Sequence, residues 1–332
     1  MTPEVPTQPT PNKSAQQQLL RAERVARVTR GLDGLDLWLC DLVRQGLAGL
    51  EQRPPAFWDA QATQLVDAQA PTLAARVRRL GRLTRGDVDW PVRMLHELGR
   101  IAMLSHAFRR LEELPPALGA DVRQLVGLSL THEEVLASGE SMQDTWIVAG
   151  QSVSDDDRVR IQRTWLLGAR SERVALLLAF APGRAAFAGS LVPGGAFEGE
   201  IVYWPSACPL RAAVRAQRES ARPPRLPGCD GIEDFRAAFA GMLARQPWLD
   251  RTFVNLRGIT PVRRGDAYAV RDARGCTLGV GSEHAWPLFA LSGGAPIDVG
   301  AEWDGETLTP LAVSRADGGG FYALAPPAKE DA

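Results

Sequence analysis

The feature that most constrains the fold of this 332-residue chain is a single change of hydrophobic period near residue 139. Before this point the apolar residues recur at three- and four-residue spacings, which is the pattern of amphipathic helices. After it, short apolar runs bounded by Gly, Pro and Asp alternate with polar residues, as is typical of strands. The sequence therefore predicts an α+β protein, in which an all-helical N-terminal domain precedes a mainly antiparallel β C-terminal half with one interrupting helix.

Capping and proline signals divide the helical domain, which we expect to span residues 14–139. Thr131 and Glu134 fit a capping box, in which each residue satisfies a free N–H group of the other at the start of a helix. Gly31 and Gly34 leave open whether the first helix is broken or continues as one long helix. Proline at the first helical position marks further starts, which predicts helices at residues 55–69, 71–83 and 91–114. Pro115 and Pro116 end the last of these helices, and a short helix at residues 117–127 follows.

The β half, residues 140–325, contains apolar runs spaced by roughly a dozen residues, which predicts an antiparallel meander or a small barrel. An amphipathic helix at residues 231–246 interrupts the strands. The basic segment before it, "PLRAAVRAQRESARPPRLPG", reads as a helix or a linker. We expect either one β domain or two subdomains, at residues 140–210 and 248–325, joined by the basic linker and the helix.

The strands of this half are predicted from their alternation and from the turn residues around them. The pair Asp304-Gly305 is a hairpin signal between the last two long runs. We expect strands at residues 144–153, 158–168, 173–181, 197–205, 252–262, 266–272, 276–281, 286–293, 296–304 and 307–313.

Charge and hydropathy restrict the partners and the cellular location that we expect for the protein. The net charge of -1 gives no overall attraction to nucleic acid or to an anionic membrane. No apolar run approaches the roughly 20 residues needed to span a bilayer, and the first residues lack the basic and apolar regions of a secretory signal. We therefore expect a cytoplasmic protein with no membrane partner. Residues 1–13, which are rich in Pro and Thr, are predicted to be a disordered tail, and residues 326–332 a second tail.

The four cysteines fit neither a zinc site nor a disulfide framework. The closest two in sequence, Cys208 and Cys229, are about twenty residues apart, whereas zinc ligands usually pair at spacings of two to four. Cytosolic proteins rarely keep disulfides. Cys40, in "GLDLWLCDLVRQGL", falls on the flank of an apolar helix face when residues are placed about 100° apart. We therefore interpret Cys40 as a packed thiol, and we predict no metal site and no cofactor.

No group of residues passes a geometric test for catalysis. His96 and His106 share a predicted helix but are ten residues apart, so they do not stack as residues four apart do. Ser282, Glu283 and His284 are consecutive in a predicted turn and strand, where neighbouring side chains point to opposite faces. We predict no catalytic residue, and an enzyme whose site is assembled from distant residues is the third of our hypotheses.

Clusters of arginine are the strongest sign of a binding function. Only Lys13 and Lys329 are lysines, and the segments "RVRRLGRLTR" and "LRAAVRAQRESARPPR" concentrate the guanidinium groups. Such clusters contact phosphates, an acidic partner or water, and the acidic stretch from Glu302 to Glu306 is a candidate partner within the chain. The candidate contact residues are Arg76, Arg79, Arg82, Arg211, Arg215 and Arg218.

Several long segments resemble the C-terminal region of bacterial SWIM zinc-finger family proteins. That family is named for a Cys-X-Cys…Cys-X-His zinc site, and this sequence contains neither a Cys-X-Cys pair nor a Cys-X-His pair. Zinc binding is therefore not carried over. The resemblance is carried by "RAERVARVTRGLDGLDLWLCDLVRQGLAGL", "FWDAQATQLVDAQAPTLAARVRRL", "RIQRTWLLGARSERVALLLAFA", "IVYWPSACPLRAA" and "LFALSGGAPIDVGAEWDGETLTPLAV".

The resemblance implies a function in assembly or maturation, because such proteins are similar in setting to those encoded beside MoxR-type AAA ATPases and von Willebrand factor A domain proteins. We expect a non-enzymatic interaction or scaffold protein of an AAA-ATPase-linked system. The implied partners are a MoxR-type AAA ATPase, a von Willebrand factor A domain protein or a separate SWIM-finger chain. The alternative is a nucleic-acid-binding protein that uses the arginine clusters.

Overall fold

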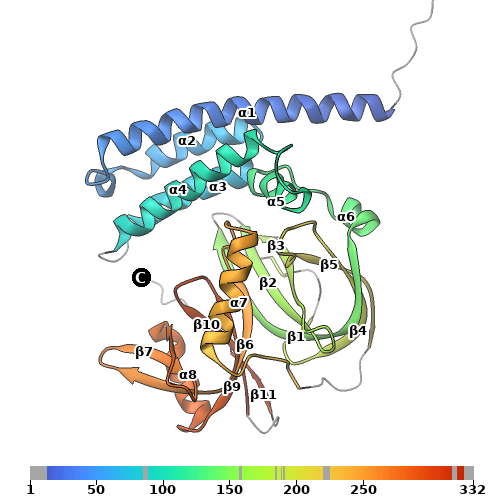
Figure 1. Cartoon of the computed structure of the whole chain (residues 1–332), viewed down its shortest axis with the longest axis vertical. Helices are drawn as coiled ribbons and strands as arrows, with labels where there is room; N and C mark the ends of the chain where they lie inside the picture. Colours follow the sequence, from blue (N-terminus) through green and yellow to red (C-terminus); the bar gives the residue numbers. More distant parts are fainter. Residues whose placement is uncertain are drawn as a thin grey trace, which may run out of the picture. The chain divides into compact units, whose positions relative to one another are not determined.

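The structure, a computed structural model, describes residues 13–84, 89–156, 159–183, 185–187, 189, 191–219, 225–315 and 320–324. The chain divides into two compact units, residues 1–129 and residues 130–332. The first unit is helical, and the second contains two antiparallel β sheets with α7 between them (Figure 1). This order of elements confirms the predicted α+β fold class. The tails predicted at residues 1–13 and 326–332 lie outside the described residues, except for Lys13.

The first unit is a bundle of helices around one apolar core. Proline in the first turn starts four of these helices, where its missing N–H group and fixed φ cost nothing. Their facing sides bury Leu32, Trp58, Leu73, Met94 and Leu104 almost completely. The helices are α1 (Lys13–Gln45), α2 (Pro55–Asp67), α3 (Pro71–Leu83), α4 (Trp90–Arg109) and α5 (Pro116–Val126), with a 3-10 turn at Leu50–Gln52.

Helix α1 runs without a break through both of its glycines. Gly31 is required where α1 meets the end of α2, because a Cβ atom there would lie 2.4 Å from the Cβ atom of Ala68. The missing side chain lets the two backbones approach closely, which offsets the cost of glycine inside a helix.

The prediction that Cys40 is a packed thiol is wrong, because the cysteine is exposed to solvent. The buried stripe of α1 is narrow and uses only positions that alternate at spacings of four and three residues. Flank positions such as that of Cys40 therefore stay outside the core. The stripe consists of Val28, Leu32, Leu35, Leu39 and Leu42.

The second unit begins with α6 (His132–Ser138), and its predicted capping box is confirmed. The Thr131 hydroxyl accepts a hydrogen bond from the Glu134 N–H group at 3.2 Å, and the Glu134 carboxylate accepts one from the Thr131 N–H group at 2.9 Å. The helix leads into a five-stranded sheet with the order β3-β2-β1-β4-β5. Its strands are β1 (Glu140–Asp156), β2 (Val159–Gly168), β3 (Val174–Pro182), β4 (Ala196–Tyr203) and β5 (Ala212–Glu219).

Strand β5 corrects the interpretation of the basic segment as a helix or a linker. Ala212, Ala213 and Val214 pair with β4, and Ala212 and Ala213 are buried. Alanine and arginine favour helices in isolation, but a pairing edge and a place in the core override that weak preference.

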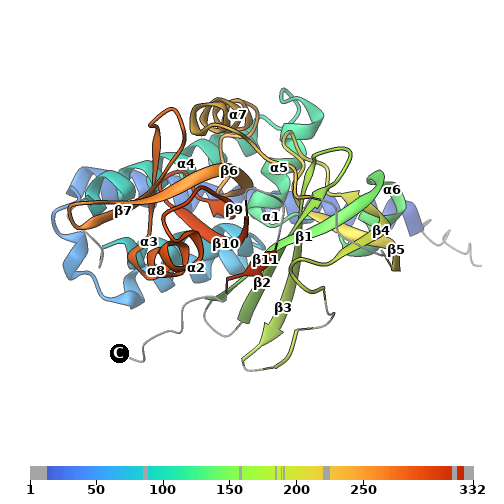
Figure 2. The same ribbon diagram turned by 90° about the horizontal axis from the view of Figure 1, so that it is seen from below.

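A second sheet follows, and it closes into a barrel because β9 pairs with both β6 and β10. Helices α7 (Ile232–Arg245) and α8 (Ser282–Ser292) lie on opposite sides of this barrel (Figures 1 and 2). The predicted hairpin at Asp304-Gly305 is confirmed, with φ of 103° at the glycine. The strands are β6 (Thr252–Arg264), β7 (Ala267–Arg271), β8 (Thr277–Val280), β9 (Ile297–Trp303), β10 (Leu308–Arg315) and β11 (Phe321–Ala323).

Helix α8 occupies residues that we expected to form a turn and a strand. Ala285, Leu288 and Ser292 are its buried residues, and their spacings of three and four are helical. Gly293, with φ of 54°, ends the helix in the left-handed conformation that glycine adopts without strain.

The two sheets follow the same path through space. In each sheet a helix leads into a long first strand, which pairs with the second and the fourth strands. The second strand also pairs with the third strand, and the fourth strand also pairs with the fifth. The third and fifth strands then meet in one parallel bridge, Leu176↔Arg211 in the first sheet and Val280↔Leu308 in the second. The first five strands of each sheet are thus arranged as in the Greek-key barrel of the OB-fold architecture, and β11 adds a sixth strand beside β10 in the second sheet. The β half therefore contains two sheets, each curled into a barrel.

A buried carboxylate joins the two barrels. Glu302, at the end of β9, accepts hydrogen bonds from Ser152 Oγ at 2.5 Å and from Trp165 Nε1 at 2.6 Å, both in the first barrel. Arg251 donates to its other oxygen at 2.8 Å. Burial alone raises the pKa of Glu302, but the Arg251 charge and these hydrogen bonds together hold it below the usual range. One residue of the predicted acidic stretch thus pairs with an arginine, although Arg251 belongs to neither cluster.

Candidate binding cleft between the two barrels

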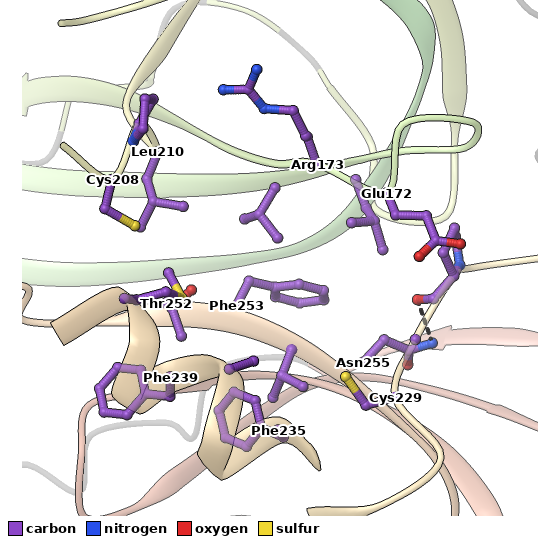
Figure 3. Close-up of a pocket in the computed structure, with 18 of the residues that line it drawn as sticks. Glu172, Arg173, Cys208, Leu210, Cys229, Phe235, Phe239, Thr252, Phe253 and Asn255 are labelled. Atoms are coloured by element: carbon purple, nitrogen blue, oxygen red, sulfur yellow. Dashed lines mark hydrogen bonds between the residues drawn. The ribbon is translucent and has the colours of Figure 1, made fainter. Parts of the chain in front are cut away.

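A cleft of about 500 Å³ lies between the two barrels and α7, inside the second unit (Figure 3). Its residues come from the β2–β3 turn, the segment before β5, the segment before α7, α7 itself and the start of β6. Pockets of this size between packed bodies are the usual place for ligand and partner binding.

The cleft has an apolar floor. Phe235 and Phe239 project from one face of α7, and Phe253 comes from β6. Phe235 and Phe239 are four positions apart and so share one face of the helix, and Phe253 belongs to a buried run of β6. All three side chains also form part of the core of the unit. The floor is therefore preformed, and an apolar group bound there would meet aromatic and aliphatic surface.

Asn255 is the polar residue of the floor. It is 3% exposed, and its amide nitrogen donates to the carbonyl oxygens of Leu226 at 3.2 Å and Pro227 at 3.1 Å. Its Oδ1 atom is buried and accepts no hydrogen bond from the described part of the chain. An unsatisfied buried acceptor costs about 1–3 kcal/mol, while the two bonds from the amide nitrogen tie the segment before α7 to β6.

Charged groups stand at the rim of the cleft. Glu172 is exposed and has φ of 54°, in the left-handed region that residues with a side chain rarely adopt. Arg173 is bound by Glu140 at 2.6 Å and lies over the Tyr203 ring at 4.4 Å from its centroid. Arg245 is exposed at the C-terminal end of α7.

Two thiols line the cleft, and Figure 3 places Cys208 and Cys229 at opposite ends of it. Both are free cysteines. Burial raises the pKa of the Cys229 thiol, so it stays protonated at neutral pH and lacks the thiolate that a nucleophile needs. No histidine from the described residues lines this cleft as a base for either thiol. The arrangement is suited to holding an apolar group beneath a charged rim.

The structure places Arg76, Arg79 and Arg82 on α3 of the first unit. Arg76 is 4% exposed and lies 3.8 Å from the carboxylate of Glu97. Arg79 and Arg82 are exposed, and each takes part in an interaction with a neighbouring residue. The spacing of three residues therefore spreads these arginines over two faces of the helix, one buried and one exposed.

Arg211, Arg215 and Arg218 lie on β5 or directly before it, in the second unit, and have different surroundings. Arg215 is bound by Glu200 at 2.5 Å and donates to the Leu136 carbonyl oxygen. Arg218 is exposed and opposite Glu198 in the strand register. Arg211 is half-buried, with its guanidinium over the Trp204 ring, 4.2 Å from the centroid.

Sequence reasoning did not find the cleft. The predicted helix at 231–246 contains its phenylalanines, but a helix face that lines a cleft has the same pattern as one that lies in a core. Asn255 carries no local signal, because the carbonyl groups that it binds are 28 and 29 positions away in the chain. The positive φ of Glu172, an exposed residue in a turn, is likewise a property of the backbone that the sequence does not reveal.

The fold defines a class of protein in which a helical bundle is followed by two tandem Greek-key barrels with a cleft between them. Residues 23–126 match the family model of the SWIM-associated four-helix bundle domain. The match runs from within α1 to the end of α5 and confirms the predicted resemblance, so the helical unit carries a SWIM-associated domain. Neither the curated proteins nor the solved structures contain a match to this chain.

Two further observations concern metals and membranes. Within the described ranges, no three His, Cys, Asp or Glu side chains are grouped as they would be around a metal ion. Over the same residues, every helix is too short or too polar to cross a membrane.

Proposed function

We propose that this protein is a non-enzymatic interaction protein that holds a partner chain in the cleft between its two barrels. The observation that carries this proposal is the cleft itself, a space of about 500 Å³ whose floor is lined by Phe235, Phe239 and Phe253. An apolar side chain of a partner would fill this space and bury its surface against the three rings. The SWIM-associated domain supports the choice, because it suggests a SWIM-family protein.

The partners proposed from the resemblance are a MoxR-type AAA ATPase, a von Willebrand factor A domain protein or a separate SWIM-finger chain. The charged rim suits a protein partner, since Glu172 and Arg245 can orient a peptide whose anchor residue fills the apolar floor. A cytoplasmic location is part of the same proposal.

The test is a pull-down from the native host with two matched variants. Ala238 is exposed on α7 and lines the cleft, so Ala238→Trp fills the space without removing a core contact. Ala237 is the preceding residue of the same helix, equally exposed but outside the cleft, so Ala237→Trp is the control. Half of each sample is treated with nuclease before capture.

We expect the wild type and Ala237→Trp to capture the same partner proteins, with or without nuclease. Ala238→Trp should fail to capture these proteins. Each such partner is then purified, and its Kd for the three forms is measured; Ala238→Trp should weaken binding at least tenfold. Capture that is the same for Ala238→Trp and wild type would rule out the cleft. Capture that disappears with nuclease would favour the nucleic-acid alternative and its arginine clusters.

A further inference from the structure

The first barrel has an open seam between β3 and β5. Among the residues that the structure describes, these strands are joined by one parallel bridge, Leu176↔Arg211, in which the Leu176 N–H group donates to the Leu210 carbonyl oxygen at 2.7 Å. The connection from β3 to β4 forms no helix in the residues that the structure describes. In the second barrel the corresponding connection contains α8, which packs against β6, β7 and β10.

Backbone groups line this seam without a strand partner. The N–H group of Leu176 points towards β5, and successive residues of a strand point their backbone groups in alternate directions. The N–H and C=O groups of Leu178 and Phe180 therefore also face the seam, beyond the last bridge. Both residues are at least partly exposed. Such an edge is a template for an added strand.

A cavity of about 490 Å³ opens along the same seam. Its lining includes Leu177 and Val214 from the two facing strands, and Gln162 and Thr164 from the inner face of β2. Gln151 completes this polar part, and its amide donates to Thr164 Oγ1 at 3.0 Å. The cavity can therefore accept small side chains that point inwards from a strand lying in the seam.

Arg211 stands at the closed end of the seam and also lines the cavity. It stacks on Trp204, which is 5% exposed, and no carboxylate of the described residues forms an ion pair with it. Burial lowers the pKa of the Arg211 guanidinium, a sign that the charge is poorly solvated. Buried charges are normally paired, and the described lining of this cavity contains no acidic residue. The missing partner is an anion.

We propose that the seam binds the C-terminal end of an extended peptide from a partner protein, which adds as a strand between β3 and β5 and places its carboxylate on Arg211. The bridge lies at the start of both strands, so a peptide that ends there runs antiparallel to both. From Leu178 to the end of β3 there is room for about four residues at roughly 3.3 Å each. This site is distinct from the cleft between the barrels.

The test presents the full-length protein to an array of random heptapeptides, each made with a free C-terminal carboxylate and as the carboxamide. We expect a set of peptides that bind at least tenfold more tightly as carboxylates. Equal binding of the two forms, or binding of neither, would overturn the proposal. This comparison uses the wild-type protein and does not depend on how a variant folds.

Variants then locate the site. Arg211→Met keeps an apolar chain over Trp204 but removes the charge, and it should lose at least tenfold in affinity for the selected peptides. Arg218→Met, an exposed arginine of the same strand, is the control and should stay within about twofold. Leu178→Pro removes an N–H group that faces the seam, and it should weaken binding more than Leu178→Ala does.

Two further arms separate this proposal from its competitors. Ala238→Trp, which blocks the cleft, should leave peptide binding unchanged, so the two proposals can fail independently. A 12-residue oligothymidylate is tested alongside the peptides. If it bound with an affinity that Arg211→Met abolished while no peptide bound, the seam would belong to nucleic acid and the peptide proposal would be wrong.

Discussion

The substitution Glu302→Gln tests how strongly one carboxylate joins the two barrels. Glutamine has the same shape, so the cavity around residue 302 stays filled and only the charge is lost. The side chain is 4% exposed and faces donors from Ser152, Trp165 and Arg251. Replacing the carboxylate turns two charge-assisted hydrogen bonds into neutral ones and places an amide opposite a guanidinium.

The magnitude follows from these contacts. A hydrogen bond to a charged group contributes about 1.5–3 kcal/mol and a neutral one about 0.5–1.5, so the bonds from Ser152 and Trp165 each lose about 1 kcal/mol. Arg251 is 37% exposed, so water screens its pairing and its loss adds only about 0.5–1 kcal/mol. The free energy of unfolding of the second unit should fall by about 3 kcal/mol in total.

Urea unfolding followed by circular dichroism measures this loss. With a slope of about 2–3 kcal/mol per molar, the midpoint of the transition should fall by about 1 M. Glu198→Gln, which removes an exposed carboxylate from β4, is the control and should shift it little. The reasoning is refuted if Glu302→Gln unfolds at the same urea concentration as this control.

Three further outcomes follow from the structure. The pKa of Glu302 in the folded protein lies below its unfolded value of about 4.3, so the stability that its charge contributes is present above pH 4.3 and is lost as the pH falls through the folded pKa. The free energies of unfolding of the wild type and Glu302→Gln, measured against pH, should therefore converge in acid. Cys40 is exposed while the other cysteines are buried or half-buried, so in the native protein a thiol reagent should label Cys40 first, as peptide mass spectrometry would show, and Cys40→Ser should remove that fast phase. A Cβ atom on Gly150 would lie 2.6 Å from the Leu311 Cβ atom, so Gly150→Ala should lower the melting temperature by an amount equivalent to about 1–3 kcal/mol, whereas Gly279→Ala, which has open space, should not.

Local signals predicted the helical half well. Proline at residues 55 and 71 and the Thr131–Glu134 capping box act within one helical turn, so these signals do not depend on the rest of the fold. Cys40 shows where such reasoning stops. Its helix face is apolar, but the width of the buried stripe depends on which helices pack against α1, and that information is not in the helix itself.

The errors in the β half have one physical cause. β5 is a strand because β4 offers it an edge, and α8 is a helix because three of its residues meet the second barrel at helical spacing. The seam is equally non-local, since Leu176 and Arg211 are 35 positions apart and the cavity needs residues from four strands. Arg211 was among the candidate residues for its charge alone, and only the fold shows that no carboxylate of the described residues forms an ion pair with it.

The repeated path of the two barrels bears on how this protein came about. A chain that traces one path twice is what tandem duplication of an ancestral segment leaves behind. After such a duplication one copy can continue to stabilise the fold while the other accumulates substitutions. In this protein the second barrel contains α8 and supplies Glu302, whereas the first has a cavity beside Arg211. Substitutions around the cavity of the first barrel can then change its shape and charge, while the second barrel, through Glu302, continues to hold the two barrels together.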